Sequence, residues 1–527
     1  MLKANWIDRA ISVVAPGAAL RRAQKRTAFD MATRGYDASK FGRLNAGWSS
    51  AASAPDVLIG ANASALREHM RDLVRNNPHA AKGIAALVNN TVGNGITPRA
   101  KGRTPKVTKK ISALWEKWSK QCDVEGQLDF NAMTTFAVRE MMEAGEIITR
   151  RVQRDKSAGI SGNMQLRFYE ADQLDDTRNG YLNQDGKVTI HGVEFADTGG
   201  RTGYYLFPYH PNSGILALKN ALVSEKVDAS VIIHLYEKQR LQTRGVPWGT
   251  PAMSSLRNLG DYELAESVRK KIESCMVGVV TGGDESDMAI NPVSANPMEA
   301  AGGGMGVVDA YGNIVERFEP GMFAYARGGR DIKFSSPSAT GSYEAYKRSQ
   351  LHSVAAGFRM PYELLTGDLS QVNYSSIRAG LIEFRRLIEA LQWQLIIPTF
   401  CQRVWGWFVS AHVVSGDLSP GDVLGVEWST PKFWSVDPLK DATADLLNLR
   451  MGSTTLFKVI TERGEDAHAT LEEIAEVCAM LDKLGLTLDS DPRKTNSAGQ
   501  VQVVVGGDGS AGNDGTGNDS AGKSPKT

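Results

Sequence analysis

Two helical patterns that lie far apart in the chain constrain the fold more than any other feature of the sequence. Residues 255–277 carry apolar side chains at every fourth position from Leu264 to Met276 and charged side chains on the other faces, which is typical of an amphipathic helix. A second, shorter helical pattern runs from Tyr343 to Phe358. The segment between them is rich in glycine, proline and methionine and is too long for an ordinary loop in a compact domain. We therefore expect two helices that are brought together around a projecting module.

A polar loop and the longest helical pattern of the chain follow the second of these helices. The loop, Thr366–Tyr374, contains one carboxylate and neither lysine nor arginine. From Ser375 to about His412, apolar residues recur along one side of a helix. Pro398 is expected to kink or break this helix, because proline lacks the backbone donor and its ring clashes with the preceding turn.

The pattern changes near Ile147. Before this residue helical patterns dominate, and Asn77-Pro78 separates the first two of them because a residue before proline avoids the helical region. From Ile147 to Tyr236 the runs are short, β-branched or aromatic, and bounded by glycine, asparagine or aspartate, as strands are. Helix-rich regions around a strand-rich layer predict a multi-domain α+β architecture.

Composition excludes several classes of protein. A chain of 527 residues favours roughly two to four domains, and a formal net charge of +1 is unlike a polycation that coats nucleic acid. The four cysteines are scattered without a CxxC pair, which favours a reducing compartment over a disulfide framework. No apolar run reaches the roughly 18–20 residues that span a bilayer, and no signal-peptide core is present, so no membrane association is expected.

No group of residues that could carry out a reaction is recognisable. The phosphate-loop, HExxH and GxSxG patterns are all missing, so we expect no enzyme activity, no catalytic residue, no metal and no cofactor. His234 lies in an apolar run and is interpreted as a satisfied core histidine. Trp115 and Trp118 share one helical face and are interpreted as core. Crowded carboxylates in a loop usually form a solvated turn, which is the interpretation of Asp172, Asp175 and Asp176.

Several segments share residue types and order with one known family, although none is specific alone. They are Leu66–Pro98, Trp115–Gly126, Gly145-Glu146, His191–Tyr205, Ile232–Trp248, Pro361–Gly380, Trp434–Ala442 and Gly452–Asp466. Over roughly residues 35–480 the chain therefore resembles the portal (head–tail connector) family of tailed bacteriophages, in its lambda-type branch.

The resemblance implies a non-enzymatic homo-oligomeric ring of about twelve copies, a dodecamer, at one vertex of the virion capsid. Double-stranded DNA would pass through its channel during packaging and ejection, without sequence specificity. The partners implied are the terminase large subunit, head-completion and tail connector proteins, and capsid and scaffold proteins. Assembly would take place in the host cytoplasm.

The resemblance also implies a domain layout. It comprises an N-terminal arm (1–60), a wing of helices and strands (61–254), a stem helix (255–279), a clip (280–340), a second stem helix (341–360), a tunnel loop (361–374), a long supporting wing helix (375–430), crown helices (431–487) and a disordered tail (488–527).

Three groups of site residues follow from this layout. The tunnel-loop group, over the DNA, is Thr366, Asp368, Ser370, Gln371, Asn373 and Tyr374. The stem group, which faces DNA or forms salt bridges between neighbouring copies, is Arg269, Lys270, Lys271, Lys347 and Arg348. The clip group, an acidic surface for terminase or an adaptor, is Asp284, Glu285 and Asp287.

Two alternatives remain open from the sequence. One is a structural adaptor of the phage head that forms no ring. The other is a nuclease or motor subunit of the packaging apparatus, which would need an acidic metal cluster or a phosphate loop. Composition alone favours an ordinary connection between helices for the tunnel loop, and only the family resemblance reverses this preference.

Overall fold

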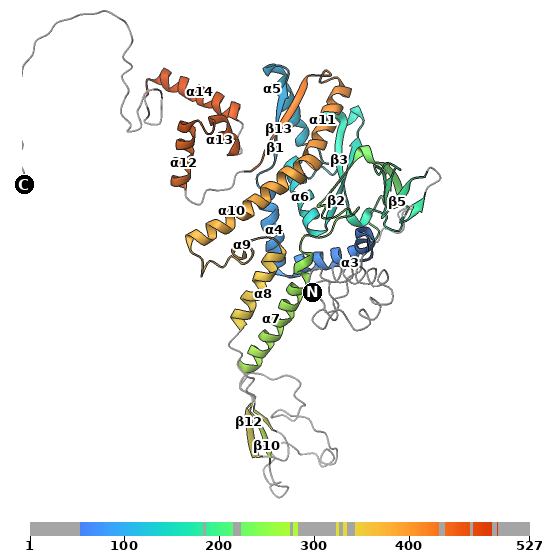
Figure 1. Ribbon diagram of the computed structural model, residues 1–527, viewed down its shortest axis with the longest axis vertical. Helices are drawn as coiled ribbons and strands as arrows, with labels where there is room; N and C mark the ends of the chain where they lie inside the picture. The colour runs from blue at the N-terminus through green and yellow to red at the C-terminus, as the bar shows by residue number, and fades with distance from the viewer. Residues whose placement is uncertain are drawn as a thin grey trace, which may run out of the picture. The chain divides into compact units, whose positions relative to one another are not determined.

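The computed structural model combines helices and sheets (Figure 1). It describes residues 53–182, 186–213, 223–274, 278–282, 323–325, 330–334, 343–431, 438–463 and 467–486, together with 488 and 493. Residues 1–52 of the arm and almost all of the tail lie outside the described residues. The same holds for Asp284, Glu285 and Asp287 of the clip.

The first helices follow the sequence signals closely. Helix α3 (Pro55–Asn76) and helix α4 (Pro78–Val92) are separated at Asn77, whose side chain accepts the backbone N–H groups of His79 and Ala80. Pro78 occupies the first turn, where its missing donor does no harm. Helix α4 ends at Gly93, whose φ of 48° favours glycine.

Helix α5 (Pro105–Ser119) and helix α6 (Phe130–Glu143) build the aromatic part of the core. Trp118 is fully buried and donates its indole N–H to the carbonyl of Met164 at 2.9 Å. Trp115 packs against Trp118 with ring centroids 5.1 Å apart. The interpretation of both tryptophans as core residues is confirmed.

Two antiparallel sheets form the strand-rich region that was predicted between Ile147 and Tyr236. In the first, β2 (Glu146–Gln153) pairs with β3 (Met164–Glu170) on one side and β9 (Ile232–Tyr236) on the other. The second sheet has the order β4 (Tyr181–Leu182), β5 (Val188–Ile190), β6 (Val193–Phe195), β7 (Arg201–Leu206), β8 (Glu225–Asp228). The 3₁₀ turns of this region are η3 (Lys156–Ala158), η4 (Ser161–Asn163), η5 (Ala171–Gln173) and η6 (Ala229–Val231).

A further strand pair was not predicted. Strand β1 (Thr97–Gly102) pairs antiparallel with β13 (Val423–Ser429), which lies more than 300 residues later in the chain. The sequence of β1, TPRAKG, has neither β-branched runs nor alternation, so its pairing depends on the tertiary structure.

The long helix does not end at Pro398. Helix α10 (Tyr374–Leu391) widens into a π-helix over Gln392–Cys401 and continues as α11 (Gln402–Ser415). Of the predicted kink or break at Pro398, the break does not occur, but the chain leaves α-helical geometry around this residue. The wider turn accommodates a residue that cannot donate to the usual carbonyl, and the Gln402 N–H bonds to Ile397 O, five residues back.

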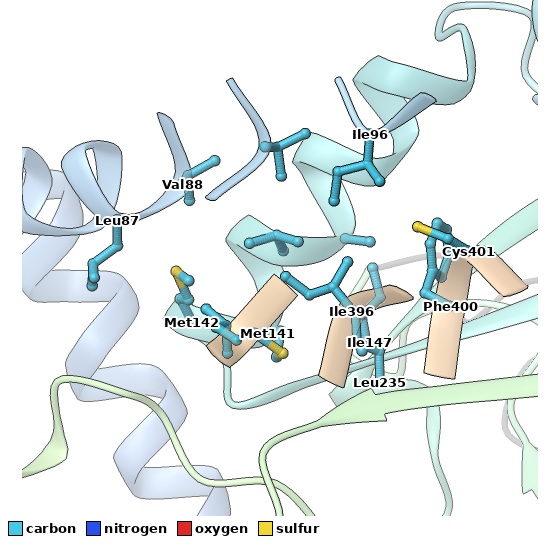
Figure 2. Packing of buried hydrophobic residues seen from close by; sticks show 14 of the residues in the cluster. Leu87, Val88, Ile96, Met141, Met142, Ile147, Leu235, Ile396, Phe400 and Cys401 are labelled. Atoms are coloured by element: carbon cyan, nitrogen blue, oxygen red, sulfur yellow. The ribbon is translucent and has the colours of Figure 1, made fainter. Parts of the chain in front are cut away.

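The π-helix contributes to the main core. Figure 2 shows side chains of α4, α6, β2, β9 and the π-helix converging in one cluster. Ile396, Phe400 and Cys401 are fully buried there. The apolar residues before and after Pro398 therefore pack into the same core.

The two helices predicted on either side of residues 278–342 are present and lie side by side (Figure 1). Helix α7 (Met253–Ser274) follows the turn η7 (Thr250–Ala252), and helix α8 (Tyr343–Gly357) precedes α9 (Tyr362–Thr366). Next to the helices, β10 (Gly278–Gly282) pairs antiparallel with β12 (Arg330–Phe334) and parallel with β11 (Phe323–Tyr325). These strands join the two ends of the module.

Among the described residues, three helices follow the strand β13. They are α12 (Pro438–Met451), α13 (Leu456–Glu462) and α14 (Ala467–Leu484). Gly452, with φ of 71°, separates the first two. Several large apolar side chains on these helices are exposed, among them Leu439 and Met451.

Candidate functional site

The connection between α9 and α10 is a structured turn. Gly367 has φ of 77° and ends α9 by donating its N–H to the carbonyl of Glu363. The Thr366 hydroxyl donates to Tyr362 O at 2.9 Å and accepts the Asp368 N–H at 3.1 Å. The loop is therefore fixed at its start by its own side chains.

Asp368 anchors this loop to helix α8. Its Oδ2 accepts from Arg348 at 2.9 Å and from the Tyr362 hydroxyl at 3.3 Å, and its Oδ1 accepts the Ser370 N–H at 3.0 Å. The hydrogen bonds from Ser370 and Arg348 hold the pKa of Asp368 well below its usual range. Arg348 also reaches the Ser370 hydroxyl at 3.3 Å. The structure thus brings together two predicted groups, the loop and the stem.

The remaining loop residues differ in their roles. Gln371 is exposed. Asn373 caps helix α10, because its Oδ1 accepts the Ser376 N–H at 2.8 Å. Tyr374 begins that helix, and its side chain lies outside the described residues.

The stem residues meet carboxylates of the same chain. Lys347 on α8 lies 2.6 Å from Glu263 on α7, and Arg269 bonds to Glu266 within α7. Tyr262 of α7 packs against Tyr343 and Tyr346 of α8. Lys270 and Lys271 lie in the last turns of α7 and also take part in polar interactions.

We expect Arg348→Gln to loosen the loop while leaving the fold intact. The variant removes the contact between Asp368 and α8, but exposed ion pairs add little to global stability. Amide hydrogen exchange at Asp368 and Ser370 should rise several-fold, and exchange in α4 should not change. Lys347→Gln, on the same helix, is the matched control. Unchanged exchange in the loop would show that Arg348 does not hold it.

A buried ionic network, centred on Glu146, was not found from the sequence. The Glu146 carboxylate is fully buried and accepts from Arg244 Nε at 2.6 Å, from the Gly245 N–H at 2.8 Å and from His234 Nε2 at 2.8 Å. Burial alone would raise the pKa of Glu146, but Arg244 and His234 hold it far below its usual range. His234 is thus a satisfied core histidine, as expected.

Two of the crowded aspartates are not a solvated turn. Asp172 accepts from Arg67 at 3.1 Å and from Arg71 at 2.6 Å. Asp175 is buried and accepts from the hydroxyls of Thr177 and Ser224, both at 2.5 Å. The expectation failed for Asp172 because the arginines of α3 lie more than 90 residues before it, and for Asp175 because Ser224 lies 49 residues after it.

One group of ligand-type atoms lies beside this network. Carboxylate oxygens of Glu170 and Asp172 and a ring nitrogen of His210 all lie within 4.8 Å of one another. Arg71 already bonds to both carboxylates, at 2.8 and 2.6 Å. A cation would have to displace this guanidinium, so the group does not fit a metal site.

Three other residues adopt the order of a hydrolase triad. Ser161 Oγ lies 3.5 Å from His412 Nε2, and His412 Nδ1 lies 2.8 Å from Asp417. His412 is fully buried and packs against Phe408 and Gly162. Because Ser161 and His412 are both buried, this contact is interpreted as one that joins η4 to α11.

The sequence matches one family over most of the chain. Residues 41–392 match the model of the phage portal protein, lambda family. The chain belongs to this portal family. Portal proteins are structural components of phages, in agreement with the expectation that the chain is not an enzyme.

Curated portal proteins are similar over most of the chain. The probable portal protein of Halomonas phage phiHAP-1 is 23% identical over 474 residues, which cover 86% of this chain and 88% of that protein. Portal protein B of Escherichia phage lambda is 20% identical over 466 residues, which cover 81% of this chain and 86% of that protein. The portal protein of Escherichia phage N15 is 20% identical with the same coverage.

Chains in solved structures of a gene transfer agent (GTA) are among the structural matches of this chain. A chain in the virion of the native GTA particle has a TM-score of 0.43 and 14% identity, covering 76% of this chain and 93% of that chain. A chain in the neck of the native particle, computed with C12 symmetry, has a TM-score of 0.41 and 15% identity, covering 78% and 94%. Among the described residues of the portal chain, no helix is long and apolar enough to span a bilayer.

Proposed function

We propose that this portal chain forms a closed ring of about twelve copies at one capsid vertex, and that double-stranded DNA passes through its channel during packaging and ejection. The observation that carries the proposal is the pairing of α7 with α8 around the segment 275–342, followed at once by the anchored loop and the long helix α10. In a portal-family chain this arrangement corresponds to stem, clip, tunnel loop and supporting helix.

The remaining parts of the layout are assigned by the same correspondence. Residues 61–254 form the wing, residues 431–487 form the crown, and residues 280–340 form the clip, which contacts a neighbouring copy. The clip also docks the terminase large subunit and, later, head-completion and tail connector proteins. Capsid and scaffold proteins surround the ring, which assembles in the host cytoplasm before it becomes part of the virion.

The chemistry of the loop supports passage of DNA without tight binding. Each cation that contacts a phosphate adds salt-dependent affinity, and a ring multiplies that contact by its number of copies. The charge of Asp368 is balanced by Arg348 within the same chain, and the exposed Gln371 is neutral. The surface offered to DNA is therefore weakly interacting and polar. The stem cations are partly balanced as well, because Lys347 and Arg269 lie against Glu263 and Glu266.

If the chain forms the proposed ring, the purified protein should have the mass of about twelve subunits. We expect native mass spectrometry to detect an assembly of about twelve 57.1 kDa subunits and negative-stain images to show a central hole. Subunit mass measured after denaturation serves as the internal control. A monomer that persists at high concentration and at every salt concentration would contradict self-assembly and favour an adaptor that needs a scaffold.

A further inference from the structure

A cleft of about 880 Å³ opens where the five-stranded sheet meets the long helix, far in sequence from the loop described above. Its lining contains four cationic side chains: Lys187, Arg201, Lys226 and Arg403. Asp228 is the one carboxylate among its lining residues. The cleft therefore carries an excess of positive charge in a chain whose overall charge is close to neutral.

Arg201 supplies a partly buried charge with uncharged neighbours. It donates to the hydroxyls of Tyr204 at 2.9 Å and Tyr236 at 2.6 Å, and to the carbonyl of Thr243 at 3.3 Å. It also lies 3.0 Å from His234 Nδ1, which must act as acceptor because a guanidinium can only donate. No carboxylate of the described residues forms an ion pair with Arg201, and a partly buried cation without one is unfavourable.

Arg403 reaches the cleft from helix α11 and remains exposed. Its one hydrogen bond to a described residue goes to the carbonyl of Ala229, at 3.0 Å. The other donors of its guanidinium can bond to a ligand. On the sheet side, Lys226 and Lys187 both approach Glu194, at 2.7 and 4.0 Å. The guanidinium donors of Arg403 that are not bonded to Ala229 thus face the cleft from one side, and two lysines that share the charge of Glu194 line the other side.

We propose that this cleft binds a phosphate group, which Arg403 contacts directly while Arg201 provides fixed positive charge behind it. The planar fork of an arginine matches the oxygens of a phosphate, and two arginines with few competing carboxylates favour an anion with more than one charge. The phosphate can belong to a free anion or to the backbone of a nucleic acid. The inference does not depend on ring formation, because the lining residues belong to one chain.

The test uses the full-length protein, inorganic phosphate as the probe, and the variant Arg403→Gln. Since Arg403 is exposed and makes one hydrogen bond, the variant should fold normally. Wild-type protein should broaden the ³¹P resonance of phosphate at constant ionic strength, and the variant should bind phosphate about tenfold more weakly, the loss expected for a charge-assisted bond. Arg386→Gln, on the exposed surface of α10, makes the same charge change outside the cleft and should behave as wild type.

A second arm identifies the source of the phosphate. Binding of a labelled duplex of about 20 base pairs is measured by anisotropy with the same proteins. Weaker binding of both probes by Arg403→Gln assigns the cleft to nucleic-acid backbone, and weaker binding of inorganic phosphate alone assigns it to a free anion. Equal phosphate broadening by all three proteins, or none by the wild type, would overturn the proposal.

Discussion

Glu146→Ala is expected to increase amide hydrogen exchange in β2 and β9 by roughly two to three orders of magnitude. The substitution leaves Arg244 buried and without its carboxylate, and removing one partner of a buried ion pair destabilises a protein by about 3–5 kcal/mol. The Gly245 N–H and His234 lose their acceptor as well. The first sheet should therefore open far more often than in the wild type.

The control is Glu116→Ala, which removes another carboxylate of an ion pair. Glu116 pairs with Lys120 at 2.8 Å, but both side chains are largely exposed, with relative accessibilities of 72% and 67%. Exchange in β2 should then stay within a factor of about two of the wild type, because exposed pairs contribute little. Equal exchange in both variants would show that the network around Glu146 does not stabilise the sheet.

The same network predicts a loss of stability in acid. Glu146 has a folded pKa below its unfolded value, so its contribution is present above about pH 4.3 and is lost as the pH falls further. Burial lowers the pKa of His234 to about 4 in the folded protein. As the pH falls below about 6.5, the unfolded state therefore binds a proton at His234 before the folded state does. Both groups weaken the sheet in acid. Exchange in β2 measured from pH 7 to pH 4, after correction for intrinsic rates, should report the part that depends on His234, because the Glu146 contribution is lost only at lower pH.

Much of the secondary structure could be predicted from local signals. The stop at Asn77-Pro78 and the strand run around Ile233 depend on neighbouring residues only. The strand β1 could not be predicted, since its partner lies more than 300 residues away. Pro398 changes the helix locally without ending it, because the cost of proline in an α-helix does not apply to a wider π-turn.

The candidate site likewise has features that could be predicted from local signals and features that depend on distant residues. The position of the loop followed from its polar residues between two helical patterns. Its anchor did not, because nothing in the sequence pairs Arg348 with Asp368 rather than with DNA or a neighbouring copy. Glu146 gave a weak signal, since a charged residue directly before a buried strand needs a partner, but its arginine lies 98 residues away.

Gln371→Lys is expected to make the proposed channel bind DNA tightly and in a salt-dependent manner. Gln371 is exposed in the loop, so the substitution should not disturb the fold. A ring of about twelve copies would gain about twelve cations, and if about six contact phosphates, affinity should fall by about three orders of magnitude between 50 and 200 mM salt. The salt dependence of binding to a duplex of about 30 base pairs, measured by anisotropy, checks this result.

Gln127→Lys separates the effect of position from that of charge. Gln127 is exposed in the turn before α6, so this variant gives each subunit the same added charge at a place assigned to the wing. If the loop faces the channel, only the Gln371 variant should steepen the salt dependence, because only there do the added charges of all copies surround one duplex. Equal slopes for the two variants would place the loop away from DNA. In that case the contact between Arg348 and Asp368 would serve to join two helices, and the lack of lysine and arginine in the loop would be unrelated to the passage of DNA.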